Sequence, residues 1–200
     1  MKQLVFMLGA LSLAVAAKAG TITITFEFNN PTGALGTTET YTQGIYSIVA
    51  SGFNGTDSPQ DLFSKNAGGD EVGIGLTNDS DFEITPGSFI QLDLSTLPLG
   101  TFALQINSDT GADAFKLYNT SVAGTLGGVV LDSQGSTSNP LLTITPSLRY
   151  LDLTATSGNV LEGPLSFTVS TTPEPATFLM IAVGLVSVGL LGRRFAAVRT

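Results

Sequence analysis

The sequence predicts an all-β protein, an antiparallel two-sheet sandwich of jelly-roll type, flanked by an N-terminal signal helix and a C-terminal single transmembrane helix. Short segments alternate apolar and polar residues with a period of two, which is the pattern of strands with one buried face. Turn residues such as Asn29-Asn30-Pro31 and Thr85-Pro86-Gly87 separate these segments at short intervals. No amphipathic helix pattern lies between them, and around eight to ten short strands in succession favour a sandwich.

The first predicted strand starts near the first residue of the predicted domain, where Ile22, Ile24 and Phe26 alternate with threonines. The same alternation recurs at residues 90–94, 102–106, 115–117, 142–144, 151–153 and 165–169. Residues 45–49 form a more continuous apolar run, which predicts a strand covered on both faces. Residues 51–69 are the least regular segment of the domain.

The composition excludes several kinds of chemistry. The 200 residues contain no Cys, His or Trp, so the chain has no disulfides, no Cys nucleophile, no Ser-His-Asp triad and no His or Cys ligands for zinc or haem. Residues 20–171 hold three basic and fifteen acidic residues, a net charge of −12. Such a surface repels nucleic acid and favours solubility, multivalent cations and neutral sugars.

The N-terminus has the features of a secretory signal peptide. Met1 and Lys2 precede an apolar run at residues 4–17, and the small-x-small tripeptide Ala17-Lys18-Ala19 follows it. Cleavage after Ala19 makes Gly20 the first residue of the mature protein. We therefore assign residues 1–19 to a signal peptide and residues 20–171 to an acidic β-sandwich domain.

The C-terminus has three parts in a fixed order: Pro173-Glu174-Pro175, an apolar stretch at residues 178–192 and the pair Arg193-Arg194. Fifteen helical residues span only about 22 Å, less than the roughly 30 Å of a hydrocarbon core. We therefore predict a transmembrane helix at residues 177–192 that crosses the bilayer marginally. The arginine pair holds the C-terminus on the cytoplasmic side, which places the β domain outside the inner membrane.

These three parts resemble the PEP-CTERM sorting signal of bacterial exported proteins. The resemblance implies that an exosortase, a membrane processing enzyme, recognises Pro173, Glu174 and Pro175, with Arg193 and Arg194 as the stop and orientation charge. The segment 172–200 is then a sorting signal that holds the precursor transiently in the membrane. The family occurs in bacteria that make exopolysaccharide and biofilm matrix, which implies a final location at the cell surface or in that matrix.

The domain itself offers one candidate metal site, a cluster of carboxylates formed by Asp70, Glu71, Asp79, Asp81 and Glu83. Calcium binds six to eight oxygen ligands, and residues 78–83 supply several of them. The loop is not an EF-hand, because Glu83 stands where that motif has glycine. The alternative interpretation is a solvated loop whose charges keep a sheet edge from pairing.

The sequence thus predicts a non-catalytic surface or matrix protein that needs no cofactor, with a calcium- or polysaccharide-binding module as the alternative. With fifteen acidic residues, some carboxylate pair meets the spacing of a glycosidase by chance, so spacing alone does not indicate hydrolysis. Sugar-binding proteins commonly stack sugar rings on aromatic side chains. The domain has only tyrosines as amphipathic aromatics: Tyr41, Tyr46, Tyr118 and Tyr150.

Overall fold

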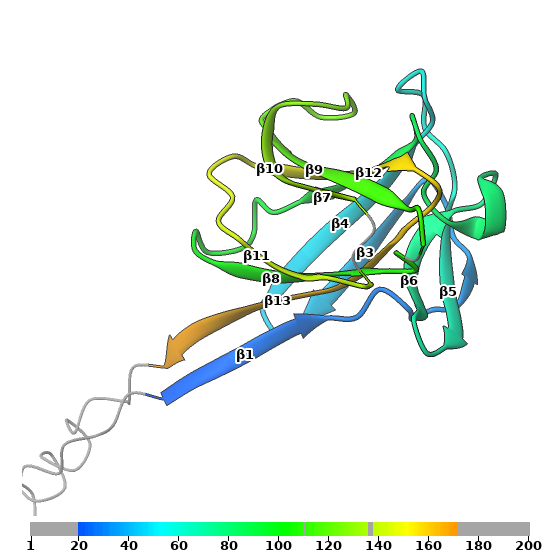
Figure 1. Ribbon diagram of the computed structural model, residues 1–200. Coiled ribbons are helices and arrows are strands. Elements are labelled where there is room, and N and C mark those ends of the chain that lie inside the picture. The colour runs from blue at the N-terminus through cyan, green and yellow to red at the C-terminus, as the bar shows by residue number, and fades with distance from the viewer. Residues whose placement is uncertain (1–19, 110, 136–137, 172–200) are drawn as a thin grey trace, which may run out of the picture. The chain divides into compact units, whose positions relative to one another are not determined.

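A computed structural model of the chain describes residues 20–109, 111–135 and 138–171. These residues form thirteen strands and one short 3-10 helix, and the strands make two antiparallel sheets (Figure 1). The predicted all-β sandwich is therefore confirmed. The predicted signal helix and the predicted transmembrane helix lie outside the described residues. Within those residues, no helix has the length and hydropathy needed to cross a membrane.

The larger sheet has seven strands in the order β11-β8-β13-β6-β5-β2, and β1 also pairs with β13. Its strands are β1 (Gly20–Phe26), β2 (Gly33–Ala34), β5 (Leu62–Gly68), β6 (Glu71–Leu76), β8 (Phe102–Asn107), β11 (Leu141–Ile144) and β13 (Leu161–Thr171). One compact unit of the chain extends from Thr23 to Val169, and residues 20–22 of β1 and 170–171 of β13 lie outside it.

The smaller sheet has six strands in the order β10-β9-β12-β7-β4-β3. Its strands are β3 (Thr38–Gln43), β4 (Tyr46–Phe53), β7 (Phe89–Asp93), β9 (Ala114–Thr120), β10 (Val129–Gly135) and β12 (Tyr150–Ser157). The 3-10 helix η1 (Ser80–Phe82) lies in the connection between β6 and β7.

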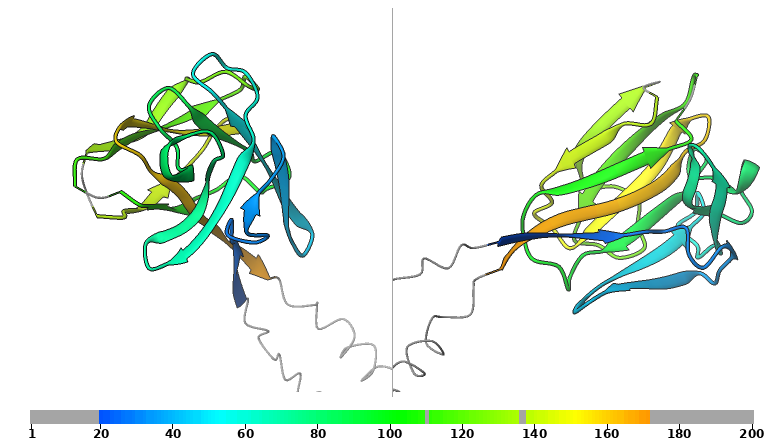
Figure 2. Two further views of the ribbon diagram at one scale, coloured as in Figure 1. Left: turned by 90° about the vertical axis from the view of Figure 1, so that its right-hand side faces the viewer. Right: turned by 90° about the horizontal axis from the view of Figure 1, so that it is seen from below.

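The strands from β6 to β13 follow the jelly-roll arrangement. Four of them form the order β11-β8-β13-β6 in one sheet, and the other four form β10-β9-β12-β7 in the other. The chain therefore crosses between the sheets at almost every connection, and the two layers enclose one core (Figure 2). Strands β4 and β3 extend the smaller sheet beyond β7, while β5 and β2 extend the larger one beyond β6.

Period-two alternation explains the core. Ile90 and Leu92 of β7 point inward and are completely buried, whereas Gln91 between them points to the outer face of the sheet. The same holds for Leu151 and Leu153 on β12. Each fully buried Leu, Ile or Phe contributes about 1.5–3 kcal/mol relative to an exposed one. A core of this size stabilises a domain that has no disulfide.

One prediction about a single segment was wrong. Residues 45–49 do not form a strand covered on both faces, because β4 alternates between buried Ile48 and Ala50 and half-buried Val49 and Ser51. The irregular segment 51–69 contains β5. Its pattern was hidden because a polar residue, Ser64, points inward and donates a 3.0 Å hydrogen bond to a backbone carbonyl.

Candidate functional site

The candidate binding site is a groove of about 320 Å³ on the outer face of the six-stranded sheet. It lies over three neighbouring strands, β4, β7 and β12, and is bounded by the loop at residues 121–128 that connects β9 to β10. Its lining residues are Val49, Ser51, Phe53, Gln91, Asp93, Ala123, Gly124 and Tyr150. All those on strands occupy outward positions in the alternation, and strand pairing places Ser51 opposite Gln91 and Asp93 opposite Tyr150.

Gln91 fixes the loop that bounds the groove. Its Oε1 accepts a 2.9 Å hydrogen bond from the Gly124 backbone N–H, and its Nε2 donates to the Val122 carbonyl at 3.1 Å. The same Nε2 donates to Asp152 Oδ1 at 2.8 Å. Since Gln91 is 4% exposed, these contacts replace water around a buried amide and order the loop over the sheet.

Asp152 lies beneath that loop and is completely buried. Burial raises the pKa of Asp152 to about 7, although hydrogen bonds from Gln91 and from the Gly127 N–H lower it in part. The carboxyl is thus near half-protonation at neutral pH. It faces the covered side of the loop and is not among the residues that line the groove.

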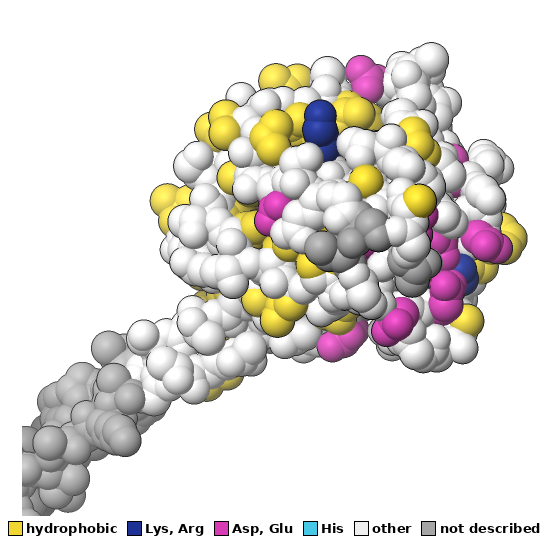
Figure 3. All heavy atoms as spheres, viewed as in Figure 1, with side chains coloured by type: hydrophobic (Ala, Val, Ile, Leu, Met, Phe, Trp, Pro, Cys, Tyr) yellow, Lys and Arg dark blue, Asp and Glu magenta, His cyan; other side chains and the backbone are white. Residues whose placement is uncertain are grey.

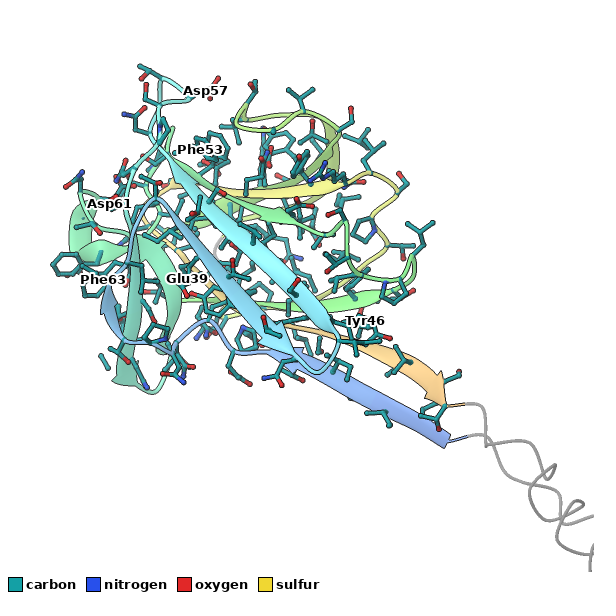
Figure 4. All side chains as sticks on the ribbon, turned by 180° about the vertical axis from the view of Figure 1, so that it is seen from behind. Glu39, Tyr46, Phe53, Asp57, Asp61 and Phe63 are labelled. Atoms are coloured by element: carbon teal, nitrogen blue, oxygen red, sulfur yellow. The ribbon has the colours of Figure 1, made fainter. Side chains whose placement is uncertain are left out.

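Two aromatic side chains give the groove its apolar surface. Phe53 lies at one end of β4 (Figure 4). It stacks on buried Phe89 with ring centroids 4.8 Å apart. Tyr150 lies under the guanidinium of Arg149, which is 4.8 Å from the ring centroid. Arg149 also binds Asp93 through two hydrogen bonds of 3.0 and 2.5 Å. These bonds hold the pKa of Asp93 below its usual range.

The predicted calcium ligands are divided among different roles. Asp79 ties down the β6–β7 connection: its oxygens accept from Gln60 at 3.0 Å, from the Thr85 N–H at 2.9 Å and from the Thr85 hydroxyl at 2.7 Å. Asp70 and Asp81 are exposed. No three carboxylates of the described residues are grouped as metal ligands.

The remaining two predicted ligands, Glu71 and Glu83, form ion pairs with Lys65. Hydrogen bonding to Lys65 lowers the pKa of Glu71. Glu83 is almost completely buried, and burial raises its pKa even though Lys65 opposes the shift. The lysine therefore occupies the position between these two carboxylates where a cation would bind.

Glycine at position 75 allows this arrangement. A Cβ at Gly75 would lie 2.1 Å from the Phe82 carbonyl oxygen, so the chain after η1 packs directly on the backbone of β6. This close approach places Glu83 next to Lys65 on the neighbouring strand β5. The sequence pattern Gly73-x-Gly75 is thus a packing feature.

Glu162 of β13 is the most unusual carboxyl in the core. It is completely buried, and neither side-chain oxygen has a hydrogen-bond partner among the described residues. Burial raises its pKa well above the usual range, and the charge of Asp152 adds to the shift. Both effects favour the protonated, uncharged form of Glu162 in the folded protein.

The predicted sorting residues lie outside the described residues, and a comparison with protein families addresses them directly. Residues 171–194 match the PEP-CTERM protein-sorting motif. The chain carries a PEP-CTERM sorting signal. The matched segment includes Pro173, Glu174, Pro175, Arg193 and Arg194. A comparison with curated proteins finds no match for the chain.

The PEP-CTERM motif makes this an exported protein that is sorted by an exosortase, with a membrane-anchored precursor before processing. Of the predicted cleavage residues, Ala17 and Ala19 lie outside the described part, and Gly20 is the first residue of β1. Sequence reasoning missed the groove. The sequence pattern that could have indicated it is the alternation in β7, where the polar residues Gln91 and Asp93 point away from the core.

Proposed function

We propose that the released domain is a non-catalytic component of the extracellular polymer layer that binds a neutral polysaccharide in the groove on the six-stranded sheet. The proposal rests on one observation: the groove combines aromatic surface with planar polar groups. Phe53 and Tyr150 supply the aromatic surface, and the Arg149–Asp93 pair lies beside Tyr150. Sugar rings pack on aromatic faces and hydrogen-bond to such groups.

The charge of the domain favours a neutral ligand. Residues 20–171 carry a net charge of −12, which repels an acidic polymer at the low ionic strengths where charges act over long distances. A neutral glycan experiences no such repulsion. The location at the cell surface or in an exopolysaccharide matrix is part of this proposal.

The chemistry of the groove favours binding without hydrolysis. A glycosidase needs two carboxyl groups about 5–10 Å apart, one of which is protonated as the general acid. Among the described residues that line the groove, the one carboxylate is Asp93, and Arg149 keeps its pKa low. The carboxyls with raised pKa values, Glu83, Asp152 and Glu162, are buried elsewhere.

The test is affinity gel electrophoresis of the processed protein, purified from the culture medium, in gels that contain soluble neutral glucans or the host's own exopolysaccharide. We expect retardation by one of these polymers. The Tyr150→Ala variant should bind roughly fivefold more weakly, since losing a stacked ring costs about 1 kcal/mol. Tyr118→Ala is the matched control, a tyrosine of the same sheet outside the groove.

Two outcomes would contradict the proposal. Equal retardation of the wild type and Tyr150→Ala would place glycan binding outside the groove. An increase in reducing ends during incubation with the bound glucan would show that the domain is an enzyme.

A further inference from the structure

The two ends of the compact unit Thr23–Val169 differ in charge. Three connections form one end, which we call the acid-poor end: residues 44–45 between β3 and β4, residues 94–101 between β7 and β8, and residues 145–149 between β11 and β12. Arg149 is the only charged residue in them, and it is paired with Asp93. The connections at the opposite end carry Asp57, Asp61, Asp70, Asp79, Asp81, Glu83, Asp109 and Asp113.

The figures show the same division. Tyr46 lies at one end of β4, and Phe53, Asp57 and Asp61 lie toward the other end (Figure 4). In the space-filling view, most of the visible Asp and Glu side chains gather on the right, over β5, β6 and the neighbouring loops (Figure 3). Hydrophobic atoms are spread over the left side of the same view.

The acid-poor end also holds the two most exposed large hydrophobic side chains of the described residues. Ile45 and Leu99 are each 88% exposed, and Leu148 is 38% exposed. A hollow of about 250 Å³ lies between the connections, with Leu97, Leu99, Phe102 and Leu148 in its wall. Single exposed hydrophobic residues are ordinary on protein surfaces, but here Leu99 and Leu148 line one hollow and Ile45 lies on a third connection of the same end.

The connections of this end are fixed in place. Thr96 Oγ1 accepts a 3.2 Å hydrogen bond from the Ser47 N–H, which joins the β7–β8 connection to the start of β4. Buried Asn119 holds the β11–β12 connection: its Oδ1 accepts from the N–H groups of Ser147 and Leu148, each at 2.8 Å. The exposed leucine and isoleucine are therefore presented on an ordered scaffold, with little entropy to lose on binding.

The chain leaves the compact unit at this same end. Phe167, two residues before Val169, packs against Tyr46 and Phe102 with ring centroids 5.2 and 5.5 Å apart. Eight residues later, at Thr177, the predicted membrane segment begins. Eight extended residues reach at most about 29 Å, so in the membrane-anchored precursor this end stays close to the bilayer.

From the charge, the exposed side chains and the point of exit, we propose that the acid-poor end rests on the lipid surface while the precursor is anchored. Ile45, Leu99 and Leu148 insert at the headgroup level, and the acidic end faces away from the bilayer. Three inserted side chains are enough to hold the domain on the bilayer, because the membrane anchor keeps their local concentration at the lipid surface high. Cleavage by the exosortase removes the tether, so the domain then dissociates.

The absence of tryptophan from the chain allows a direct test. Single variants Leu99→Trp and Ile45→Trp of the full-length precursor, made in a host without exosortase, are reconstituted into phosphatidylcholine vesicles with or without brominated acyl chains. Phe82→Trp, at an exposed position of η1 on the acidic end, is the matched control. We expect bromine to reduce the emission of the Leu99 and Ile45 variants roughly twofold and to leave the control unchanged, since interfacial contacts reach 5–10 Å into the lipid.

Equal emission with and without bromine in both the Leu99 and Ile45 variants would overturn the proposal. The tryptophan emission of these variants could also shift to the blue only when exosortase is added, without quenching by bromine. That result would overturn the proposal too, because the enzyme would then occupy this end in place of lipid.

Discussion

The Gln91 side chain donates a 2.8 Å hydrogen bond to Asp152 across the β7–β12 pair, beneath the loop that bounds the groove. One buried amide therefore satisfies a buried carboxyl and two backbone groups of the loop. The stability of the groove is thus linked to the protonation of Asp152, whose pKa burial raises to about 7.

The first prediction concerns the pH dependence of folding. Asp152 keeps its proton up to about pH 7 when folded but loses it near pH 4 when unfolded, so its contribution to stability falls as the pH rises between those values. Three pKa units correspond to at most about 4 kcal/mol. Urea unfolding of the released domain should show a flatter pH dependence between pH 4 and 8 for Asp152→Asn.

Asp81→Asn is the control for this prediction, because it removes the same charge from an exposed loop position. If Asp81→Asn flattened the profile as much as Asp152→Asn, the net charge of the domain would explain the effect, and burial of Asp152 would not.

The second prediction concerns Glu162, a buried carboxyl without a partner among the described residues. A methionine of similar length removes a polar group that the core does not satisfy, so Glu162→Met should raise the free energy of unfolding by roughly 1–3 kcal/mol. The gain should be larger at pH 8 than at pH 5, because burial raises the pKa of folded Glu162 above that of the unfolded chain, so its contribution to stability falls as the pH rises. A loss of stability at pH 8 would show that Glu162 has a favourable role.

The third prediction concerns Lys65, which pairs with buried Glu83. Lys65→Met leaves that carboxylate without its cation and should lower the free energy of unfolding by about 3 kcal/mol at neutral pH. The cost should shrink as the pH falls, because burial raises the pKa of Glu83 and a protonated carboxyl no longer needs a cation beside it. Lys116→Met is the control, since Lys116 belongs to no ion pair among the described residues; an equal loss in both variants would contradict the prediction.

The fourth prediction concerns the sorting motif. Replacing Pro173 and Pro175 with Ala removes both prolines from the sorting motif that the exosortase is predicted to recognise. The variant should stay in the membrane fraction with an unchanged urea midpoint of its β domain, measured after proteolytic release. Normal appearance in the medium would show that the two prolines are not needed for recognition.

Structural features that depend only on neighbouring residues could be predicted from the sequence. Alternation gave Ile90 and Leu92 their inward positions, and the sorting motif is a continuous segment with its own charge and hydropathy pattern. The role of Lys65 could not be predicted. That role depends on strand pairing and on the close approach of the chain at Gly75. These bring Lys65 next to Glu71 and Glu83, which lie six and eighteen residues further along the sequence.

The groove illustrates the same division. The outward position of Gln91 follows from the pattern of β7, but its contact with Asp152 joins residues 61 apart in the chain. The loop that covers Asp152 has no periodic pattern, so its position over the sheet is determined by hydrogen bonds that only the folded chain makes.

The intact mass and location of the protein, compared in a host with an exosortase and in one without it, show whether the exosortase processes the precursor. We predict a released form that lacks both ends only where the enzyme is present, and a membrane-bound form with its full C-terminus where it is absent. A full C-terminus in the membrane fraction of both hosts would contradict it.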